Sequence, residues 1–315
     1  MKKIPMNKLL ETTVDGYTFQ KEWSAKGDMG PRGLLLDIAM FFGLIGPGLF
    51  MVSHLVGFGR GMMLGFLTFL IGYGLPHLFF LGRAERFIGA MLRPQSSWIS
   101  RGFMFANAFI IFGFLSVAPL LPIVGGSIPD LGPAIRDNAP PLAFLSALLV
   151  VVYPGFLFST LRAISFWNSK LLIPLFVILS FEGGIALTMI LVQATGETAI
   201  DVGPLADYET RIILGVIVLV GFYLGREYGR GSASRESVVF LTSGRFSQIF
   251  DGGAITVGLV LPFLIGLYAT QAAVSPTVIG LAGLLEIVGI FLLKYSIVHA
   301  GIYKPLIPAV PILDR

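Results

Sequence analysis

LLIPLFVILSFEGGIALTMILVQ, residues 171–193, is a predominantly apolar run of 23 residues with one charged side chain, Glu182. An α-helix of about 20 apolar residues is long enough to cross the hydrocarbon core of a bilayer. Every backbone polar group must be satisfied internally in hydrocarbon, so a helix is the expected conformation. A charged carboxylate at the centre of such a helix costs about 2.5–3.5 kcal/mol on the insertion scale. The run therefore predicts a membrane helix that turns Glu182 towards a protein interior.

Apolar stretches of this kind recur along the whole chain. We expect an all-α, polytopic integral membrane protein with eight transmembrane helices, arranged as two four-helix bundles. The sixth stretch is short for a span, but Arg211 and Arg226 at its ends can extend it by snorkelling. The eight stretches are Gly33–Phe58, Met62–Gly82, Gly102–Gly126, Pro141–Leu161, Leu171–Gln193, Ile212–Leu224, Gly253–Gln271 and Pro276–Ala300.

The composition agrees with a chain that mostly faces lipid. Charged residues make up 13% of the sequence and the mean hydropathy is +0.84, whereas a soluble domain carries about 25% charged residues. We divide the chain into a tail at 1–32, a first four-helix bundle plus the start of the fifth helix at 33–194, the remaining helices at 195–300, and a second tail at 301–315.

The basic residues are distributed unevenly about the expected helices. Of the 22 Lys and Arg residues, 18 lie on the side that holds both termini, and Lys294 lies inside the last helix. The opposite side holds Arg60, Arg136 and Arg211. Basic loops stay in the cytoplasm, so we expect a multi-pass protein of the inner (cell) membrane with both termini cytoplasmic. The net charge of +4 follows from this asymmetry and does not indicate nucleic-acid binding.

The metal-ligating residue types are scarce. The sequence has no cysteine and three histidines. Iron–sulfur clusters are normally held by thiolates, so we expect no cluster on this protein. A haem would need His77 and His299 at matching depth, and we do not expect one. Any redox chemistry would then use a diffusible organic carrier or the cofactors of a partner.

Four polar residues stand out in the cytoplasmic halves of the first four helices. Asp37, His77, Asn107 and Tyr153 fall at comparable depth once the alternating helix direction is counted. The carbonyls of a quinone need hydrogen-bond donors, and its reduction or oxidation needs groups that exchange protons, which histidine and carboxylate supply. The shared depth predicts a quinone-binding site.

Each of these residues also has a plainer structural interpretation. Asp37 could be an interfacial cap, His77 could belong to an aromatic belt, and Asn107 could bond a neighbouring helix. Tyr153 precedes Pro154 and could mark a kink.

Two glutamates fall near the middle of the membrane. Glu182 and Glu286 lie in the fifth and eighth helices, and Lys294 shares the eighth helix. We expect both glutamates to face the bundle and to be largely protonated. They are candidates for a proton path or for an ion pair with Lys294. The alternative is a neutral glutamic acid bonded to a backbone carbonyl.

The segment YPGFLFSTLRAISFWNSKLLIPLFVILSFEGGIAL, residues 153–187, resembles the NrfD/polysulfide-reductase membrane-subunit family. That family shows a tyrosine–glycine helix end, an aromatic–Trp–Asn turn and an apolar helix with paired small residues. The last helix, GLLEIVGIFLLKYSIVHAG, and the first, FFGLIGPG, look similar more loosely. The matching residues in the segment are Tyr153, Gly155, Trp167, Asn168, Pro174, Ser180, Gly183 and Gly184.

The resemblance implies a quinone-reactive membrane anchor of a respiratory complex. Members of the family work with a ferredoxin-like iron–sulfur subunit and often with a molybdopterin catalytic subunit. The family's pocket tyrosine corresponds to Tyr153, and a polar residue of its first helix lies near Asp37, where some members have histidine.

Our sequence-based prediction is a subunit that binds menaquinone or ubiquinone, exchanges electrons with an iron–sulfur partner, and is not catalytic alone. The first alternative is an ion- or proton-coupled secondary transporter, which would use the same buried carboxylates. The second is an assembly anchor with a degenerate site. In each case we expect the protein to contact membrane lipid and protein partners, and not nucleic acid.

Overall fold

The computed structural model describes residues 11–14, 17–20, 31–81, 89, 92–121, 132–244 and 246–302. Within these ranges, eight helical segments are long and apolar enough to cross a membrane. The predicted all-α, polytopic membrane fold is therefore confirmed. A short antiparallel pair of strands, β1 (Glu11–Val14) and β2 (Tyr17–Gln20), precedes the helices. The rest of the predicted tail at 1–32, up to residue 30, and most of the tail at 301–315 lie outside the described residues.

Five crossings consist of a single long helix, and the second, third and seventh are composite. The second crossing joins α2, the π-helical η2 and α3, the third joins α5 and the short η3, and the seventh joins η5 and α10. The bounds are α1 Pro31–Leu55, α2 Gly59–Thr68, η2 Phe69–Gly74, α3 Leu75–Leu81, α5 Trp98–Val117, η3 Ala118–Leu120, α6 Gly132–Thr160, α7 Leu172–Thr195, α8 Gly203–Arg230, α9 Ser232–Thr242, η5 Gln248–Val260, α10 Leu261–Ala269 and α11 Pro276–His299.

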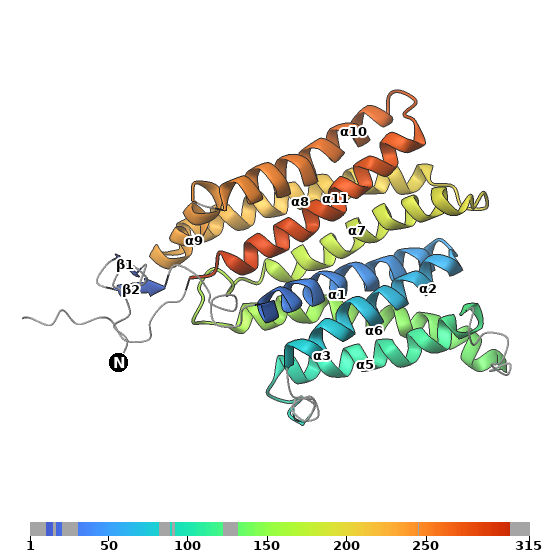
Figure 1. The fold of residues 1–315 in the computed structure, drawn as a ribbon, viewed down its shortest axis with the longest axis horizontal. Helices are drawn as coiled ribbons and strands as arrows, with labels where there is room; N and C mark the ends of the chain where they lie inside the picture. The colour runs from blue at the N-terminus through green and yellow to red at the C-terminus, as the bar shows by residue number, and fades with distance from the viewer. Residues whose placement is uncertain are drawn as a thin grey trace, which may run out of the picture.

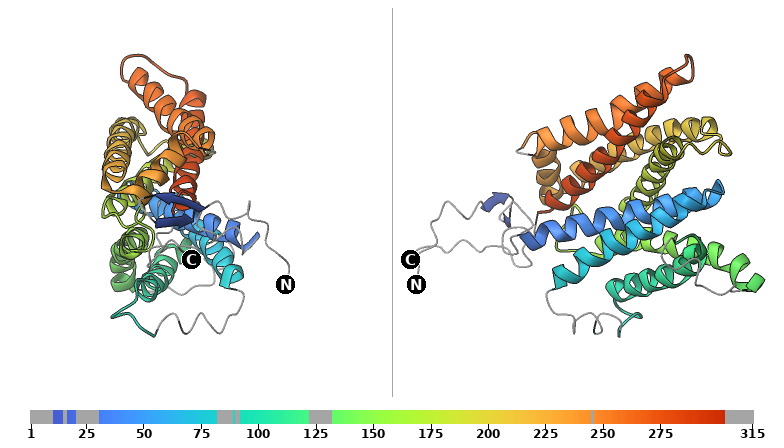
Figure 2. Two further views of the ribbon diagram at one scale, coloured as in Figure 1. Left: turned by 90° about the vertical axis from the view of Figure 1, so that its left-hand side faces the viewer. Right: turned by 45° about the vertical axis from the view of Figure 1, so that its right-hand side comes forward.

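The helices form two groups that meet at α1 and α7 (Figure 1). In one group α1 packs against α2–η2–α3 and α6, and α5 packs against α6; in the other α7 packs against α8 and α11, and α11 packs against η5. Figure 2 shows that α1 begins at the same end of the molecule at which α11 ends. We call this end the proximal face and the opposite end the distal face.

Glycines let the central helices approach closely. A Cβ built at Gly48 of α1 would overlap the Ser180 carbonyl oxygen of α7, and one at Gly184 would overlap the Gly48 carbonyl. A Cβ at Gly65 of α2 would lie 2.5 Å from the Phe50 nitrogen of α1. Small residues have this role in membranes because apolar side chains gain little by leaving lipid. The glycines of the first two crossings are thus packing residues.

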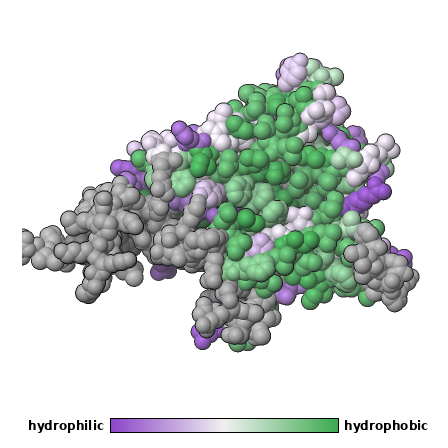
Figure 3. Space-filling model, viewed as in Figure 1, coloured by the Kyte–Doolittle hydropathy of each residue, from purple (hydrophilic) through white to green (hydrophobic). Residues whose placement is uncertain are grey.

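The outside of the bundle is apolar. Figure 3 shows a broad hydrophobic surface across the visible face, with hydrophilic residues towards the helix ends. Large apolar side chains stand exposed at mid-helix, including Ile111, Val218 and Phe222. Such patches on a soluble monomer would be unusual in size, and here they form the surface that lipid covers.

Two predicted boundaries are wrong. The sixth stretch was expected to be short, at 212–224, but α8 runs over Gly203–Arg230. The parts of α8 outside the predicted stretch carry Glu209 and Glu227, which are both buried. The fourth stretch was expected to begin at Pro141, yet α6 begins at Gly132 and continues through Pro140, Pro141 and Pro154. Neighbouring helices and polar side chains compensate for the backbone bonds that proline removes in such helices.

Candidate functional site

Three rings from two crossings form a connected group in the proximal half of the first helix group. Tyr153 of α6 is hydrogen-bonded to Tyr73 of η2 through the side chains. The Tyr73 ring lies 4.5 Å from the His77 ring of α3, centroid to centroid, and stacks on Phe69 at 4.6 Å. We call Tyr73, His77 and Tyr153 the ring cluster. His77 and Tyr153 were predicted from the sequence as site residues, whereas Tyr73 was not.

Glycines make room for the ring cluster. A Cβ at Gly102 of α5 would lie 2.5 Å from the Tyr153 ring, and one at Gly43 of α1 would lie 2.6 Å from the Tyr73 ring. Buried polar atoms nearly always have a partner, but His77 Nδ1 is buried without one among the described residues. Two phenols and an imidazole therefore converge, and one of their polar atoms remains available to a bound group.

Asn107 lies on α5, but its amide is engaged locally. Its Nδ2 donates to the Phe103 carbonyl of the same helix at 2.8 Å. The predicted role of Asn107 in binding a quinone stays a prediction.

Asp37 contacts the last helix rather than the ring cluster. His299 Nε2 lies 3.0 Å from Asp37 Oδ2 and 3.2 Å from Oδ1. Lys294 Nζ donates to the Met40 carbonyl of α1, and its charge interacts with that of Asp37. All three side chains are buried, with relative exposures of 7%, 5% and 4% for Asp37, His299 and Lys294. We call these three residues the seam cluster, because they join α1 to α11.

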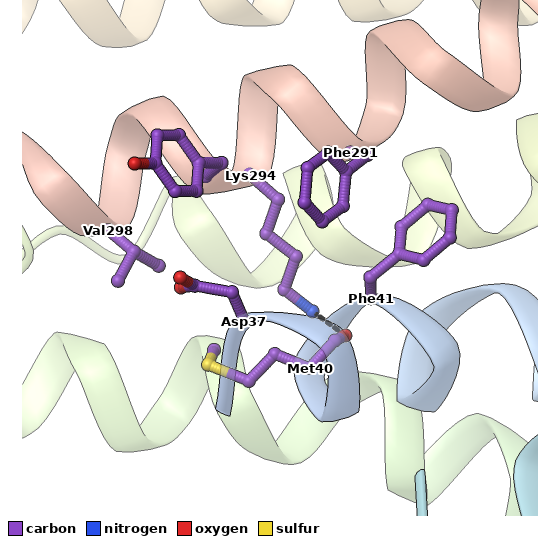
Figure 4. Close-up of a pocket in the computed structure, with 7 residues that line it drawn as sticks. Asp37, Met40, Phe41, Phe291, Lys294 and Val298 are labelled. Carbon is purple, nitrogen blue, oxygen red and sulfur yellow. Dashed lines mark hydrogen bonds between the residues drawn. The ribbon is translucent and has the colours of Figure 1, made fainter. Parts of the chain in front are cut away.

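A small cavity accompanies the seam cluster. Its volume is about 10 Å³, which is close to the size of one water molecule. Figure 4 shows the Lys294 side chain reaching from α11 to the Met40 carbonyl, with the Asp37 carboxylate beside it. The lining residues are Asp37, Met40, Phe41, Phe291, Lys294, Tyr295 and Val298.

Lys294 does not form the predicted ion pair with a glutamate. Its contacts are with α1 and with the Phe176 ring of α7, whose centroid lies 5.2 Å from Nζ. Eight residues separate Glu286 from Lys294, which corresponds to about 12 Å along a helix. Lys294 is closer to the Met40 carbonyl and to Asp37 than to Glu286, although Lys294 and Glu286 lie on the same helix.

The two predicted mid-membrane glutamates do face the protein interior. The exposures of Glu182 and Glu286 are 0% and 1%. A third residue, Glu209 of α8, lies within hydrogen-bonding reach of Glu286, and Glu182 is near enough to both for their charges to interact. We call Glu182, Glu209 and Glu286 the glutamate cluster. Its geometry does not fit a metal: in the described part of the sequence no group of three His, Asp or Glu residues could hold one.

Glu209 was not predicted because it precedes the sixth expected stretch, which was placed at 212–224. A detectable signal was present. Apolar residues lie at helical spacing on both sides of Glu209, and they form one buried stripe of α8: Leu205, Ile213, Val216 and Val220. A stripe of this kind indicates the packed face of a helix, so it would have turned Glu209 inward.

The aromatic–Trp–Asn turn between α6 and α7 has a structural role. Trp167 Nε1 donates to the Ile297 carbonyl at 2.9 Å, and the Tyr223 hydroxyl donates to the Phe166 carbonyl at 2.7 Å. Arg230 donates to both the backbone and the side-chain oxygen of Asn168. The turn is thus fixed to α8 and α11. The buried carboxylate that holds the arginines is Glu227, which contacts Arg226, Arg230 and Ser234.

These features define a class of protein. Crossing helices enclose aromatic, acidic and basic groups near one face and carboxylates at mid-depth, so this is a multi-pass membrane protein with a polar interior. The family profile described as "Polysulphide reductase, NrfD" matches residues 30–305. The chain belongs to the NrfD/polysulphide reductase family, and the resemblance found in its sequence is confirmed.

Named relatives agree with this assignment. The protein is 27% identical over 187 residues to Protein NrfD of Escherichia coli, an alignment that covers 58% of each sequence. It is 26% identical over 263 residues to a Protein NrfD homolog of Haemophilus influenzae, with 76% of this sequence and 81% of the relative covered. It is 26% identical over 165 residues to a polysulfide reductase subunit of Wolinella succinogenes, with 51% of this sequence and 52% of the relative covered. The matched region thus spans little more than half of the first and third relatives.

Proposed function

We propose that this protein is the quinone-reactive membrane subunit of a respiratory oxidoreductase complex. The observation that carries the proposal is the ring cluster, in which Tyr73, His77 and Tyr153 converge in the proximal half. Family membership supports it, and one relative is named as part of a polysulfide reductase. The partners would be a ferredoxin-like iron–sulfur subunit and a molybdopterin catalytic subunit.

The residues of the ring cluster suit a quinone headgroup. The buried, unpartnered Nδ1 of His77 could bond one carbonyl, and the Tyr153 phenol could donate to the other. A bound menaquinone or ubiquinone would carry two electrons and two protons between partner and membrane. Tyr73 would hold Tyr153 in position through their hydrogen bond. Asn107 could contribute only by releasing the Phe103 carbonyl.

Asp37 would serve as the proton-exchanging group on the α1 side. Its carboxylate lies 3.0 Å from His299 Nε2, a distance at which a proton can pass directly. His299 is the last residue of α11, at the proximal face. A proton released in this half would therefore pass from Asp37 to His299 and leave at that face, while Lys294 balances the charge of Asp37.

The proposed location is the inner membrane with the proximal face in the cytoplasm. The excess of basic residues on the side of both termini supports this orientation. The ring cluster also lies in the proximal half, so we propose that the partner that exchanges electrons with the quinone binds this face.

One observation favours a second candidate function, an ion- or proton-coupled transporter. The glutamate cluster in the second helix group has no part in the ring cluster, and buried membrane carboxylates often couple to ions. In either function, Glu182 and Glu286 would carry protons, with Lys294 acting near Asp37 instead of beside the glutamates.

The test compares Tyr153→Phe and His77→Ala with Tyr228→Phe, a matched control at an exposed tyrosine of α8. Each variant would be assayed for quinone-linked turnover in membranes that contain the assembled complex. We expect both ring-cluster variants to lower turnover at least tenfold without loss of assembly, while the control is unchanged. Wild-type turnover in both ring-cluster variants would show that the proposed site is wrong.

A further inference from the structure

Three helices of the second group each contribute one buried carboxyl group to the same place. Glu182 of α7, Glu209 of α8 and Glu286 of α11 have relative exposures of 0%, 7% and 1%. The carboxyl groups of Glu209 and Glu286 lie within hydrogen-bonding reach of each other, and Glu209 Oε1 and Glu286 Oε2 have no partner among the described residues. Glu182 interacts electrostatically with this pair. Neither of its carboxyl oxygens has a hydrogen-bond partner among the described residues.

A direct hydrogen bond between two carboxyl groups requires a proton. An ionised carboxylate only accepts hydrogen bonds, whereas a protonated carboxyl group also donates one. A bond between the side chains of Glu209 and Glu286 therefore needs at least one of them to be protonated. Glu182 adds a fully buried, unpartnered carboxyl group beside this pair, so the cluster contains further acceptor atoms that a second proton would satisfy.

No basic side chain of the described residues lies against the cluster. On α11 the basic residues are Lys294, which is bonded to the Met40 carbonyl, and His299, which is bonded to Asp37. On α8 Asp207 and Arg211 are exposed, and Arg211 lies over the Tyr208 ring. Glu182 is the one charged residue of α7, and Asp251 is the one charged residue of η5–α10. Asp251 lies in the first turn of η5, at the proximal end of that crossing.

The members of the cluster lie at graded depth from the distal face. Counting along their helices at 1.5 Å per residue, Glu209 lies about 9 Å, Glu286 about 15 Å and Glu182 about 20 Å from the distal end. On the proximal side of Glu182 and Glu286 the packing becomes apolar, because the fully buried Leu179 and Ile290 each lie about one turn closer to the proximal face. Ile290 lies one turn after Glu286 and one turn before Lys294, so an apolar layer separates this cluster from the seam cluster.

We propose that Glu182, Glu209 and Glu286 form a proton-binding site that is reached from the distal face, with Glu209 as its outermost member. The site holds at least one proton, shared between Glu209 and Glu286, and Glu182 is the inner acceptor. It is separate from the ring cluster and does not depend on quinone binding. Lys294 is not part of it.

The protonation state can be tested with dicyclohexylcarbodiimide, an apolar reagent that reacts with protonated carboxyl groups. The carboxyl oxygen bonds to the central carbon of the reagent, the carboxyl proton moves to a reagent nitrogen, and rearrangement gives a stable N-acylurea without loss of atoms. The assembled complex in membranes would be treated and mapped by mass spectrometry. We expect label on the cluster, and at least tenfold less in the double variant Glu209→Gln, Glu286→Gln. Glu227 is the matched control, because it is equally buried but paired with Arg226 and Arg230.

An infrared measurement covers the case in which the reagent does not reach the site. The carbonyl stretch of a protonated carboxyl group should be present in the wild type and should decrease in the Glu209→Gln and Glu286→Gln variants, which preserve shape and bonding. A spectrum that both substitutions leave unchanged, together with no labelling, would show that the glutamates are ionised and would overturn the proposal.

The direction of access can be tested with one introduced thiol. The sequence has no cysteine, so Glu209→Cys supplies a unique site for a membrane-impermeant thiol reagent. In sealed vesicles we expect modification at least ten times faster from the distal side than from the proximal side. Faster reaction from the proximal side, or equal rates from both, would refute distal access. Correct assembly of this variant would be confirmed by recovery of its partners. Because these readouts do not involve quinone turnover, they can fail independently of the proposed function.

Discussion

At the scale of single residues, depth in the membrane could be predicted better than contact partners. The sequence placed Asp37 in the proximal half, and α1 indeed carries it there. Its partner, His299, lies 262 residues away, and the sequence alone contains nothing that pairs the two. Helix α1 turns Asp37 towards α11 and Gly43 towards Tyr73. The predicted four-residue site is thus divided between two faces of α1.

A double-mutant cycle on Asp37 and His299 tests the seam cluster. Removing one member leaves the other buried without its partner, which destabilises proteins strongly. We therefore expect Asp37→Asn and His299→Ala each to lower stability, with a coupling energy of about 0.5–3 kcal/mol between them. Unfolding would be measured in micelles.

His54→Ala is the control for this cycle, because His54 lies at the distal end of α1 near the Phe144 ring. It should show no coupling to Asp37→Asn. Additive effects of the Asp37 and His299 substitutions would argue against their contact.

At the scale of the elements, apolar length identified all eight crossings, while their ends were misjudged where charge lies inside a helix. The first and fifth stretches begin and end within a few residues of α1 and α7, because their polar flanks coincide with the helix ends. The bounds of the sixth stretch were wrong because two glutamates near the ends of α8 are held inside the protein. Glu209 interacts with Glu286, and Glu227 interacts with Ser234 and two arginines. Local composition does not report such contacts.

The contact between α1 and α7 provides a prediction at this scale. A Cβ added at Gly48 would overlap the Ser180 carbonyl oxygen, so Gly48→Ala requires the helices to separate. Overpacking of this kind typically costs about 1–3 kcal/mol. We expect a lower thermal unfolding midpoint for Gly48→Ala. Gly215→Ala in α8 is the matched control, since a Cβ there meets nothing within 4 Å. An unchanged midpoint in Gly48→Ala would contradict the close contact.

At the scale of the whole molecule, the polar interior is divided by depth. The ring and seam clusters lie in the proximal half, and the glutamate cluster extends from mid-depth towards the distal face. The fully buried Leu179 and Ile290, each about one turn proximal to the glutamate of its helix, separate the two regions. Electron exchange and proton uptake would thus face opposite sides of the membrane, a separation that the sequence suggested only through the depths of individual residues.

The partner's docking face is the last prediction. Electron transfer weakens steeply with distance, so an iron–sulfur partner should bind the face nearest the ring cluster. The cysteine-free sequence allows single thiols to be placed on either face, at the exposed Arg162 and Lys170 and at the half-buried Glu197. The variants Arg162→Cys and Lys170→Cys place a thiol on the proximal face, and Glu197→Cys places one on the distal face. With a short thiol-to-amine cross-linker, we expect the partner to be captured from the two proximal positions and not from the distal one. Capture from Glu197→Cys alone would place the partner on the other side and would require electrons to cross the apolar layer, which the proposed arrangement does not allow.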